Sequence, residues 1–493
     1  MENTLDLAAL AAKITGVAFD SRKVRPGFAF VAIAGAKDDG AKYIGEALSR
    51  GASALVVADG VALPDLPGSE AGRIEIIRVP SPGPVLSELA CEFYGNPSRK
   101  LAVYAVTGTN GKTTTAGLVR DILDSTGRTC GLLSTVEYSW PGHCEEASRT
   151  TPDPVLAQSA LAAMAGAGCT AASIEASSHA LHQGRISGVR LAAAAFSNLS
   201  QDHFDYHSGF EDYFACKRKL FEQLGRENPG APAVINRDDP YGRRLLADAA
   251  SLGVKPVSYS LGDEGDIRAS GIVLGAASTA FTLHAFGESA HLEAGLVGRY
   301  NVSNMLCAAG MALATGVPFG TVVEALSRAK PRWGRLERVL VGDGRDDRRA
   351  KVFVDYAHSP DAIEKALAAL REVTAARLSI VFGCGGDRDR AKRPLMAGVA
   401  ARLADRVYLT SDNPRTEDPE AILDEVETGI KGTATPYVRL ADRREALARA
   451  ILESGPGDVI LVAGKGHETY QEVNGVHHHF DDRETVRQLL GAC

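Results

Sequence analysis

The chain lacks several features that mark common classes of protein. Its eight cysteines are scattered along 493 residues without a Cys-x-x-Cys pair, which argues against a structural zinc site and a disulfide framework. The formal net charge of −7 leaves no broad basic face, so we expect no nucleic-acid partner. The most apolar long stretch, 156–180, is diluted by alanine and glycine, so no membrane insertion is expected. No signal peptide is visible, which together with the cysteine pattern predicts a cytoplasmic protein.

A glycine-containing loop that ends in Lys-Thr follows the apolar run 103–106. Backbone N–H groups in such a loop bind phosphate oxygens, while Lys112 neutralises them and the Thr113 hydroxyl can ligate Mg²⁺. The loop is shorter than the standard one, because Val106 stands where its first glycine belongs. An ordinary strand-turn-helix corner is the rival interpretation. The loop predicts ATP binding by Gly108, Thr109, Asn110, Gly111, Lys112, Thr113 and Thr114.

Turn-rich breaks at 94–99 and 330–334 divide the chain into three predicted domains, 1–97, 98–330 and 331–493, in line with about 150 residues per domain. Apolar runs that alternate with helical segments predict parallel sheets covered by helices, and therefore an α/β fold. Central strands are expected at 101–106, 130–135, 171–175, 192–196 and 232–236, and a hairpin at 268–274 and 278–284. C-terminal strands are expected at 352–354, 378–382, 406–409 and 459–462.

Acidic and imidazole side chains gather after two of these strands. Glu175 ends one strand, at the edge where ligands bind in open α/β sheets, and is a candidate Mg²⁺ ligand. The segment 198–207 holds further oxygen and nitrogen donors, among them Asp202, His203 and His207. Mg²⁺ prefers oxygen, so this segment alone leaves zinc open, and a polar loop that caps the next helix is the alternative. A Ser-His nucleophile at 177–179 is disfavoured because no Gly-x-Ser-x-Gly elbow surrounds it.

Together these motifs resemble the Mur ligases, and within them the branch that adds the third residue of the peptidoglycan stem peptide. Asp412-Asn-Pro-Arg415 and Gly464-Lys-Gly-His-Glu468 are, with 383–388, the most specific to this branch. The resemblance covers essentially the whole chain and is also carried by 20–22, 107–114, 150–152, 175–179, 202–207, 236–239, 334–337 and 355–360.

The resemblance implies an ATP-dependent ligase of peptidoglycan precursor synthesis. The γ-phosphate of ATP would pass to a carboxylate of UDP-N-acetylmuramoyl-L-alanyl-D-glutamate, and an incoming amine would displace it from the acyl phosphate. It also implies an N-terminal UDP-substrate domain, a central parallel-sheet P-loop domain and a C-terminal Rossmann-like domain that chooses the amino acid. The alternatives are an L-lysine-adding relative, another such ligase or a folylpolyglutamate synthetase, and a non-catalytic P-loop module. A monomer is expected.

Site residues follow from the resemblance position by position. Catalytic roles fall to Lys112, Lys217, Glu175 and His203, and Mg²⁺ ligands to Thr113, Glu175, His203 and Lys217. Lys217 would carry a carbamate formed from CO₂, with Lys219 as the alternative position. Adenine and ribose contacts fall to Asn301, Asn304, Arg335, Asp355 and His358. The UDP-muramoyl-dipeptide would contact Phe19, Ser21, Thr150, Thr151, Ser177, Gln183 and Arg185, with Ala36, Lys37 and Asp38 near the uridine.

The implied amino-acid site contains Arg388, Asp412, Asn413, Pro414, Arg415, Gly464 and Glu468. A guanidinium binds a carboxylate through two hydrogen bonds, and Glu468 can accept from an ammonium group. This set therefore suits a diamino dicarboxylic acid, and meso-diaminopimelate is favoured over lysine. Three consecutive histidines at 477–479 are interpreted as the solvated edge of a hairpin instead of a metal site.

Overall fold

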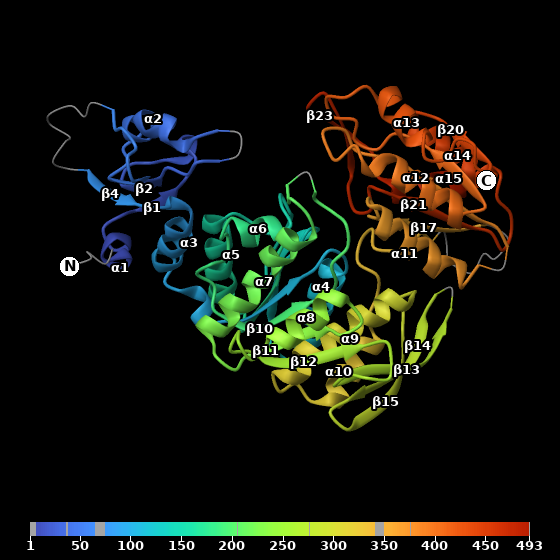
Figure 1. Cartoon of the computed structure of the whole chain (residues 1–493), viewed down its shortest axis with the longest axis horizontal. Coiled ribbons are helices and arrows are strands. Elements are labelled where there is room, and N and C mark those ends of the chain that lie inside the picture. The colour runs from blue at the N-terminus through green and yellow to red at the C-terminus, as the bar shows by residue number, and fades with distance from the viewer. Residues whose placement is uncertain are drawn as a thin grey trace.

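The computed structural model describes residues 6–35, 38–64, 74–204, 206–275, 277–340, 350–374 and 376–492. Figure 1 shows three bodies in chain order, with the N-terminal and C-terminal ones on either side above the central one. Each body has its own main sheet, and these sheets fall within 1–97, 98–330 and 331–493. The limits of the three domains themselves stay a prediction. None of the described helices is long and apolar enough to cross a membrane.

The N-terminal body is a small parallel sheet with apolar side chains on both faces. The strand order is β1 (Gly16–Ala18), β2 (Phe28–Val31), β3 (Ala54–Ala58) and β4 (Glu75–Val79). Two separate apolar clusters lie against the sheet, so the short apolar strands β2 and β3 are buried on both faces. Its helices are α1 (Leu7–Ala11), α2 (Ile44–Ser49) and α3 (Pro82–Phe93).

The central body is built on one large sheet that is parallel in its middle and antiparallel at both edges. In spatial order the strands are β15 (Glu288–Ala294), β14 (Thr279–Ala285), β13 (Ile267–Leu274), β12 (Lys255–Ser260), β11 (Pro232–Asn236), β10 (Leu191–Phe196), β5 (Ala102–Thr107), β9 (Ala171–Glu175), β6 (Cys130–Leu133), β7 (Glu137–Trp140) and β8 (His143–Glu146). All five central strands and the hairpin expected from the sequence are present.

Helices cover both faces of this central sheet. The cluster on one face includes side chains from α4 (Lys112–Ser125), α9 (Arg299–Ala314) and α10 (Phe319–Ser327). The cluster on the other includes side chains from α5 (Pro154–Gly166), α6 (Ser178–His182), α7 (Phe210–Glu227) and α8 (Pro240–Asp248). The middle strands are therefore buried on both faces, which explains their continuous apolar runs.

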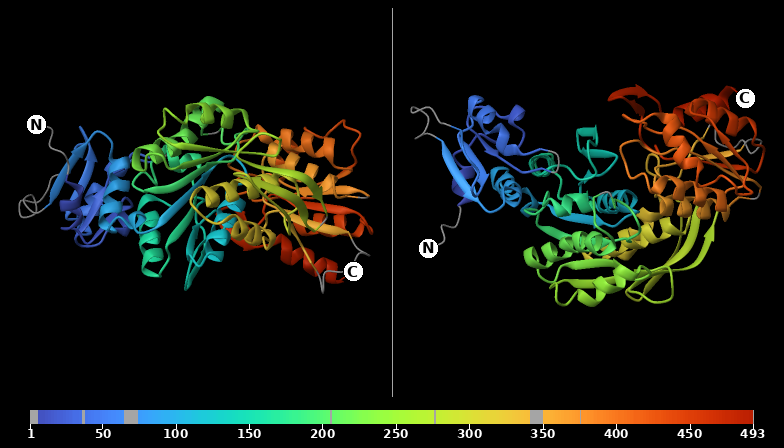
Figure 2. Two further views of the ribbon diagram at one scale, coloured as in Figure 1. Left: turned by 90° about the horizontal axis from the view of Figure 1, so that it is seen from below. Right: turned by 45° about the horizontal axis from the view of Figure 1, so that its top comes forward.

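The C-terminal body repeats this design on a smaller scale (Figure 2). Its strands are, in spatial order, β16 (Glu337–Arg338), β17 (Lys351–Asp355), β21 (Val459–Ala463), β18 (Leu378–Phe382), β19 (Arg406–Leu409) and β20 (Tyr437–Arg439). Its helices are α11 (Pro360–Arg371), α12 (Lys392–Leu403), α13 (Pro419–Glu427), α14 (Arg443–Leu452) and α15 (Asp482–Ala492). A separate hairpin joins β22 (Tyr470–Val473) to β23 (Val476–His479), whose histidines are exposed as the sequence predicts.

A fully buried ion pair ties the first residues of α14 and α15 together. Arg443 donates two hydrogen bonds of 2.7 Å to the Asp482 carboxylate, and neither side chain reaches solvent. Arg443 also donates to the carbonyls of Ser411 and Ala463, at 3.3 and 3.0 Å. These carbonyls stand directly before the loops that begin at Asp412 and Gly464, so the pair holds both loops in place.

We expect Asp482→Ala to lower the free energy of unfolding by about 3–5 kcal/mol, because it leaves a buried guanidinium without its counterion. Urea denaturation monitored by circular dichroism measures the loss. Glu364→Ala is the matched control, because it breaks the exposed Arg402–Glu364 pair and should cost only about 0–1 kcal/mol. Equal losses in the two variants would contradict this role of the buried pair.

Candidate active site

The phosphate loop runs from the end of β5 to the first turn of α4. Gly108 and Gly111 both have positive φ angles, 147° and 86°. A Cβ at Gly108 would lie 1.9 Å from Ser197 Oγ, and one at Gly111 would lie 2.3 Å from Asn304 Oδ1. The loop is therefore packed against the end of β10 and against α9 so closely that only glycine fits. Two of its N–H groups, those of Thr109 and Asn110, donate to Asn198 O at 2.8 Å and Asn198 Oδ1 at 3.0 Å. The phosphate cradle is therefore expected at the N–H groups that start α4, and phosphate binding there stays a prediction.

Two buried lysines converge on one carbonyl of this loop. Lys112 Nζ donates to the carbonyls of Gly108 and Thr109, both at 2.9 Å, and Lys217 Nζ donates to the same Gly108 carbonyl at 2.8 Å. Burial lowers the pKa of both amines, that of Lys217 especially, and the charge of Lys112 lowers the pKa of Lys217 further. Among the described residues, neither amine hydrogen-bonds to a carboxylate. The loop therefore presents two amines without a direct carboxylate hydrogen bond where a phosphate would bind.

Glu175 and Thr113 lie on the wall of the same cavity. Glu175 is fully buried at the end of β9, and its carboxylate accepts hydrogen bonds from Thr135 N at 2.7 Å and Thr135 Oγ1 at 3.0 Å. The Thr113 hydroxyl accepts from Arg335 Nη2 at 2.8 Å. Thr135 was not predicted as a site residue, although its position at the end of an expected strand was a usable signal.

The structure separates the histidines of 202–207. His203 Nε2 lies 3.5 Å from Asp202 Oδ2, and both residues line the cavity. Burial lowers the pKa of His203, so its ring is neutral at physiological pH. His207 is instead buried against α7 and contacts Asp212 and Cys216. The single donor cluster that the sequence left open is therefore two different environments.

The cavity above the phosphate loop has a volume of about 550 Å³ and is lined by both the central and the C-terminal bodies. Asn304, Arg335, Asp355 and His358 line it, as predicted for a nucleotide site. Asp355 accepts from the backbone N–H groups of Leu336 and Ala357, at 2.6 and 2.8 Å. Burial raises the pKa of Asp355 and lowers that of His358 to about 4.

Asn301 differs from the other predicted nucleotide residues, because it does not line the cavity. It donates to the Val297 carbonyl at 2.9 Å, and its side-chain oxygen accepts from Asn304 Nδ2 at 3.1 Å. Asn301 therefore positions Asn304, which stands directly against Gly111.

A contact between the C-terminal and central bodies lies at this cavity. One carboxylate oxygen of Asp361, in α11, accepts from Asn110 Nδ2 at 2.5 Å, Ser200 Oγ at 2.9 Å and Lys365 Nζ at 2.8 Å. No sequence pattern pointed to Asp361, because its hydrogen bonds join it to Asn110 and Ser200, which are 251 and 161 positions away.

A second cavity of about 410 Å³ shares Asp202, His203, Tyr356 and His358 with the first. The predicted amino-acid residues that line it are Arg388, Asp412, Asn413, Arg415, Gly464 and Glu468. Pro414 does not line it, although it lies between two residues that do. Its walls therefore bring together strand-end loops of the C-terminal sheet and the metal-binding candidates of the central one.

Hydrogen bonds fix the polar groups of this second cavity. Arg415 donates to the Gly386 carbonyl at 2.7 Å and to Glu472 Oε2 at 3.1 Å, and its φ angle is 53°. Glu468 accepts from Asn413 Nδ2 at 2.7 Å and from the fully buried Lys465 at 3.2 Å. Burial and the neighbouring Asp412 raise the pKa of Glu468. The cavity thus holds a guanidinium and a carboxylate in separate, fixed positions.

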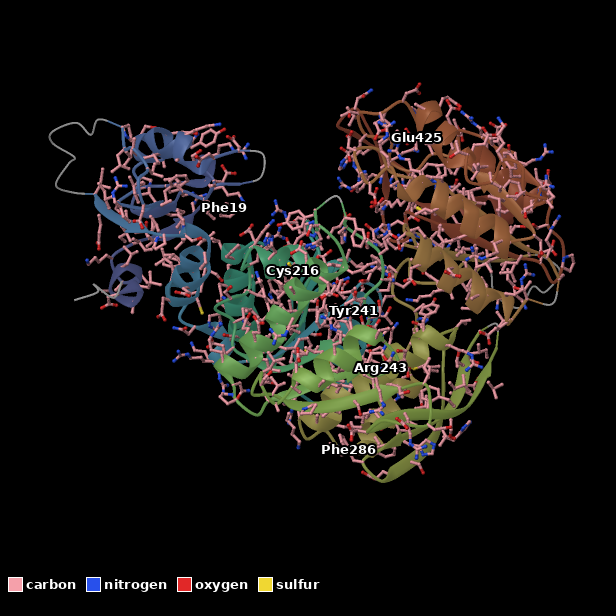
Figure 3. All side chains as sticks on the ribbon, in the orientation of Figure 1. Phe19, Cys216, Tyr241, Arg243, Phe286 and Glu425 are labelled. Carbon is pink, nitrogen blue, oxygen red and sulfur yellow. The ribbon has the colours of Figure 1, made fainter. Side chains whose placement is uncertain are left out.

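A third cavity of about 1020 Å³ lies between the N-terminal and central bodies. It is lined by Phe19, Ser21, Asp38, Gln183 and Arg185, and also by Arg149, His182 and Tyr206. Figure 3 shows Phe19 on the side of the N-terminal body that faces the rest of the molecule. Ala36 and Lys37, expected near the uridine, lie outside the described residues.

The remaining predicted substrate residues lie near the end of β9. Thr150 lines the first cavity. The buried Thr151 donates to the Glu175 carbonyl at 2.7 Å and accepts from Ser177 N at 3.0 Å. Thr151 therefore bridges the end of β9 and the residue before α6. Their contact with a substrate stays a prediction.

Comparison with known proteins agrees with this architecture. The profile described as "Mur ligase family, catalytic domain" matches residues 13–94, "Mur ligase middle domain" matches 106–312, and "Mur ligase, glutamate ligase domain" matches 334–466. The UDP-N-acetylmuramoyl-L-alanyl-D-glutamate–2,6-diaminopimelate ligase of Chlorobaculum tepidum is 45% identical over 98% of this chain and 92% of its own length. The ligase of the same name from Pseudomonas aeruginosa is 43% identical over 97% and 95%.

Solved structures give the same result. A structure of a UDP-N-acetylmuramoyl-L-alanyl-D-glutamate–2,6-diaminopimelate ligase superposes with a TM-score of 0.68 at 34% identity, covering 97% of this chain and 95% of that one. The MurF ligase of Thermotoga maritima in complex with ADP shares the fold, with a TM-score of 0.62 at 20% identity, covering 99% and 98%. As its motifs predicted, the chain belongs to the Mur ligase family.

Proposed function

We propose that this chain is an ATP-dependent ligase that joins meso-diaminopimelate to UDP-N-acetylmuramoyl-L-alanyl-D-glutamate in the cytoplasmic synthesis of peptidoglycan precursors. The observation that carries the proposal is the shared wall of two cavities. One contains a phosphate loop and the other a fixed guanidinium and carboxylate, and Asp202, His203, Tyr356 and His358 line both. The names of the relatives at 43–45% identity support the same substrates. Because one chain lines all three cavities, we infer that it acts as a monomer.

The reaction must bring a triphosphate close to a carboxylate, and the two anions repel each other. The loop N–H groups and Lys112 would bind the phosphates, and Lys112 would neutralise charge that grows as the γ-phosphate moves to the substrate carboxylate. The carboxylate oxygen attacks the γ-phosphorus and ADP leaves. The amine nitrogen of the amino acid then attacks the acyl carbon, phosphate leaves and the amine loses a proton. The shared wall supports this order of steps, because the acyl phosphate would form in the first cavity next to the amine in the second.

The residues at the loop fit Mg²⁺. Thr113 and Glu175 supply hydroxyl and carboxylate oxygens, which this ion prefers, and both residues line the first cavity. Thr113, Glu175, His203 and a carbamylated Lys217 would hold the ion. When bound, Mg²⁺ would offset phosphate charge.

Carbamylation of Lys217 requires a neutral amine, because CO₂ adds to the free electron pair of nitrogen. Lys217 is 1% exposed, and burial together with Lys112 holds the pKa of its amine well below the usual range. Lys219, the alternative position, is exposed. The carbamate is therefore proposed on Lys217.

The assay that tests the proposal is ADP release with UDP-N-acetylmuramoyl-L-alanyl-D-glutamate and either meso-diaminopimelate or L-lysine. Wild type should turn over with diaminopimelate and only poorly with lysine, because lysine lacks the distal carboxylate that Arg415 would bind in addition to its contact with Glu472. Equal use of lysine would refute the substrate assignment, and ADP release without either amino acid would refute the ligase assignment.

We expect Arg415→Ala to raise the KM for diaminopimelate far more than that for ATP, with a loss of about 2–5 kcal/mol in apparent binding. Arg415→Lys should restore only part of the affinity for diaminopimelate, since lysine keeps the positive charge but lacks the planar guanidinium that makes two hydrogen bonds to a carboxylate. Arg402→Ala removes an exposed arginine of α12 and is the control that should leave all KM values unchanged. An unchanged diaminopimelate KM in Arg415→Ala would contradict the role of this guanidinium.

We expect Lys217→Ala to lose most activity, and added short carboxylic acids to restore part of it by occupying the position of the carbamate. Lys219→Ala, two residues further along α7, is the control and should stay active. Crystallographic electron density beyond Lys217 Nζ in a nucleotide complex is the direct measurement. A bare amine there, together with full activity of Lys217→Ala, would rule the carbamate out.

A further inference from the structure

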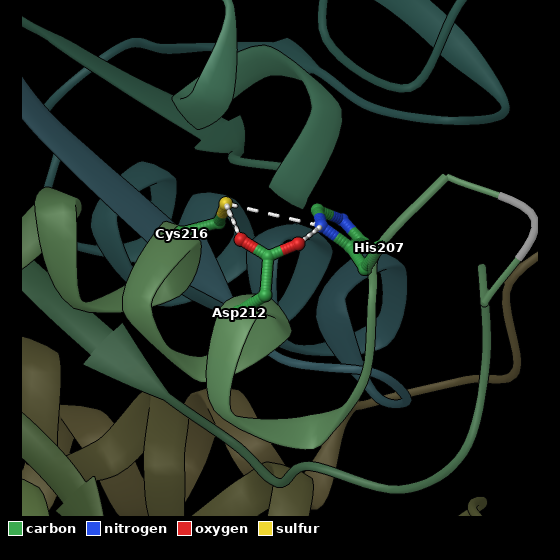
Figure 4. Close-up of side chains that lie close together, drawn as sticks. All are labelled: His207, Asp212 and Cys216. Carbon is green, nitrogen blue, oxygen red and sulfur yellow. Dashed lines mark hydrogen bonds and ion pairs between the residues drawn. The ribbon is translucent and has the colours of Figure 1, made fainter.

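His207, Asp212 and Cys216 converge at the start of α7, outside all three cavities (Figure 4). His207 Nδ1 lies 3.4 Å from Asp212 Oδ2 and 3.9 Å from Cys216 Sγ, and Cys216 Sγ lies 4.0 Å from Asp212 Oδ1. His207 and Cys216 are buried, whereas the Asp212 side chain is 44% exposed. An imidazole, a thiol and a carboxylate therefore face one point that is open to solvent on one side.

The local fold holds each of the three groups. Asp212 and Cys216 are four residues apart in α7, which places them on one face of the helix. The other ring nitrogen of His207, Nε2, lies 2.9 Å from Ser178 Oγ, which fixes the ring so that Nδ1 points at the other two groups. Ser208 N donates to Asp212 Oδ2 at 3.1 Å. Metal-binding histidines and carboxylates commonly have such outer partners.

The separations suit a shared metal ion better than mutual hydrogen bonds. The His207–Asp212 distance of 3.4 Å exceeds the usual range of about 2.7–3.2 Å for a nitrogen–oxygen hydrogen bond. A tetrahedral Zn²⁺, with bonds of about 2.0–2.1 Å to nitrogen and oxygen and about 2.3 Å to sulfur, places its ligand atoms about 3.3–3.6 Å apart. The His207–Asp212 distance already lies in that range. Asp212 faces His207 with Oδ2 and Cys216 with Oδ1, and with one oxygen taken from Asp212 the three ligand atoms lie within 4.8 Å of one another. Cys216 Sγ must therefore move toward the other two groups when an ion binds.

We propose that His207, Asp212 and Cys216 form a binding site for one Zn²⁺ ion, with water as the fourth ligand on the exposed side of Asp212. Thiolate and imidazole select zinc over Mg²⁺, which prefers oxygen. The site is therefore chemically distinct from the Mg²⁺ position at the phosphate loop. Binding would release the thiol proton of Cys216, because the thiolate is the ligand.

The position of the site in the chain gives it a structural consequence. His207 ends the segment that carries Asp202 and His203 on the cavity wall, and Cys216 directly precedes Lys217. An ion bound to both would join that segment to α7. It would stabilise the arrangement in which Lys217 reaches the Gly108 carbonyl.

Co²⁺, which replaces Zn²⁺ in thiolate sites and is coloured, is the probe. Metal-free full-length protein in a non-coordinating reductant with excess Mg²⁺ should bind one equivalent of Co²⁺ and show a thiolate-to-Co²⁺ charge-transfer band. Zn²⁺ should abolish the band by displacement. Cys216→Ala should lose the band and bind Zn²⁺ about 100-fold or more weakly, since loss of an outer partner alone costs about 10–100-fold. Asp212→Asn should weaken binding while keeping the thiolate band.

Two control variants remove other exposed donors. Cys144→Ala removes the exposed thiol of β8, and a triple alanine variant removes the exposed histidines 477–479. Both should keep the band and the single equivalent. Absence of a thiolate band in wild type, its persistence in Cys216→Ala or its loss in Cys144→Ala would overturn the proposal. Circular dichroism of metal-free Cys216→Ala shows whether the variant has lost only a ligand or its fold as well. If that variant is unfolded, Asp212→Asn decides the question. An unchanged Zn²⁺ affinity in Asp212→Asn would equally overturn the proposal.

Discussion

Two buried amines on a single carbonyl oxygen are the constraint on which the rest of the active site depends. Lys112 comes from the loop itself and Lys217 from α7, yet both donate to Gly108. Two cations brought together in a desolvated position repel each other, so the arrangement favours an anion beside the loop and a neutral form of one amine. The first condition is met by a phosphate. The second is the condition that the proposed carbamate on Lys217 requires.

The amino-acid end of the site depends on a different buried charge. Arg443 and Asp482 lie behind the C-terminal sheet, and Arg443 reaches the carbonyls that precede Asp412 and Gly464. Replacing a buried ion pair with apolar residues often leaves the free energy of unfolding unchanged. The Arg443–Asp482 pair therefore serves to position the loops that Arg443 contacts. It fixes two strand-end loops relative to each other. Because Asn413 from one loop bonds Glu468 from the other, the carboxylate of the cavity is placed by this remote pair.

The sequence predicted those parts of the fold that are determined by residues close together in the chain. Continuous apolar runs gave the buried parallel strands, and the glycines at 108 and 111 gave the phosphate loop. The edge strands β7, β8 and β15 were missed because they are short or polar, and pairing with neighbours defines them more than their own residues do. Asp361 was missed because tertiary contact alone gives it a role, whereas Thr135 was overlooked although it ends an expected strand. The different environments of His203 and His207 likewise depend on which side of α7 each ring meets.

The nucleotide cavity is complete only where two bodies meet. The loop that would bind the phosphates belongs to the central body, whereas Arg335, Asp355 and His358 belong to the C-terminal one. Arg335 hydrogen-bonds Thr113 and Asp361 hydrogen-bonds Asn110, so both bridges end on residues of the phosphate loop. A shift of the C-terminal body would therefore alter the loop and the amino-acid cavity together, since both cavities share the wall at Tyr356 and His358. If the binding of nucleotide and the binding of amino acid are coupled through this shared wall, linkage requires that each affects the other by the same factor.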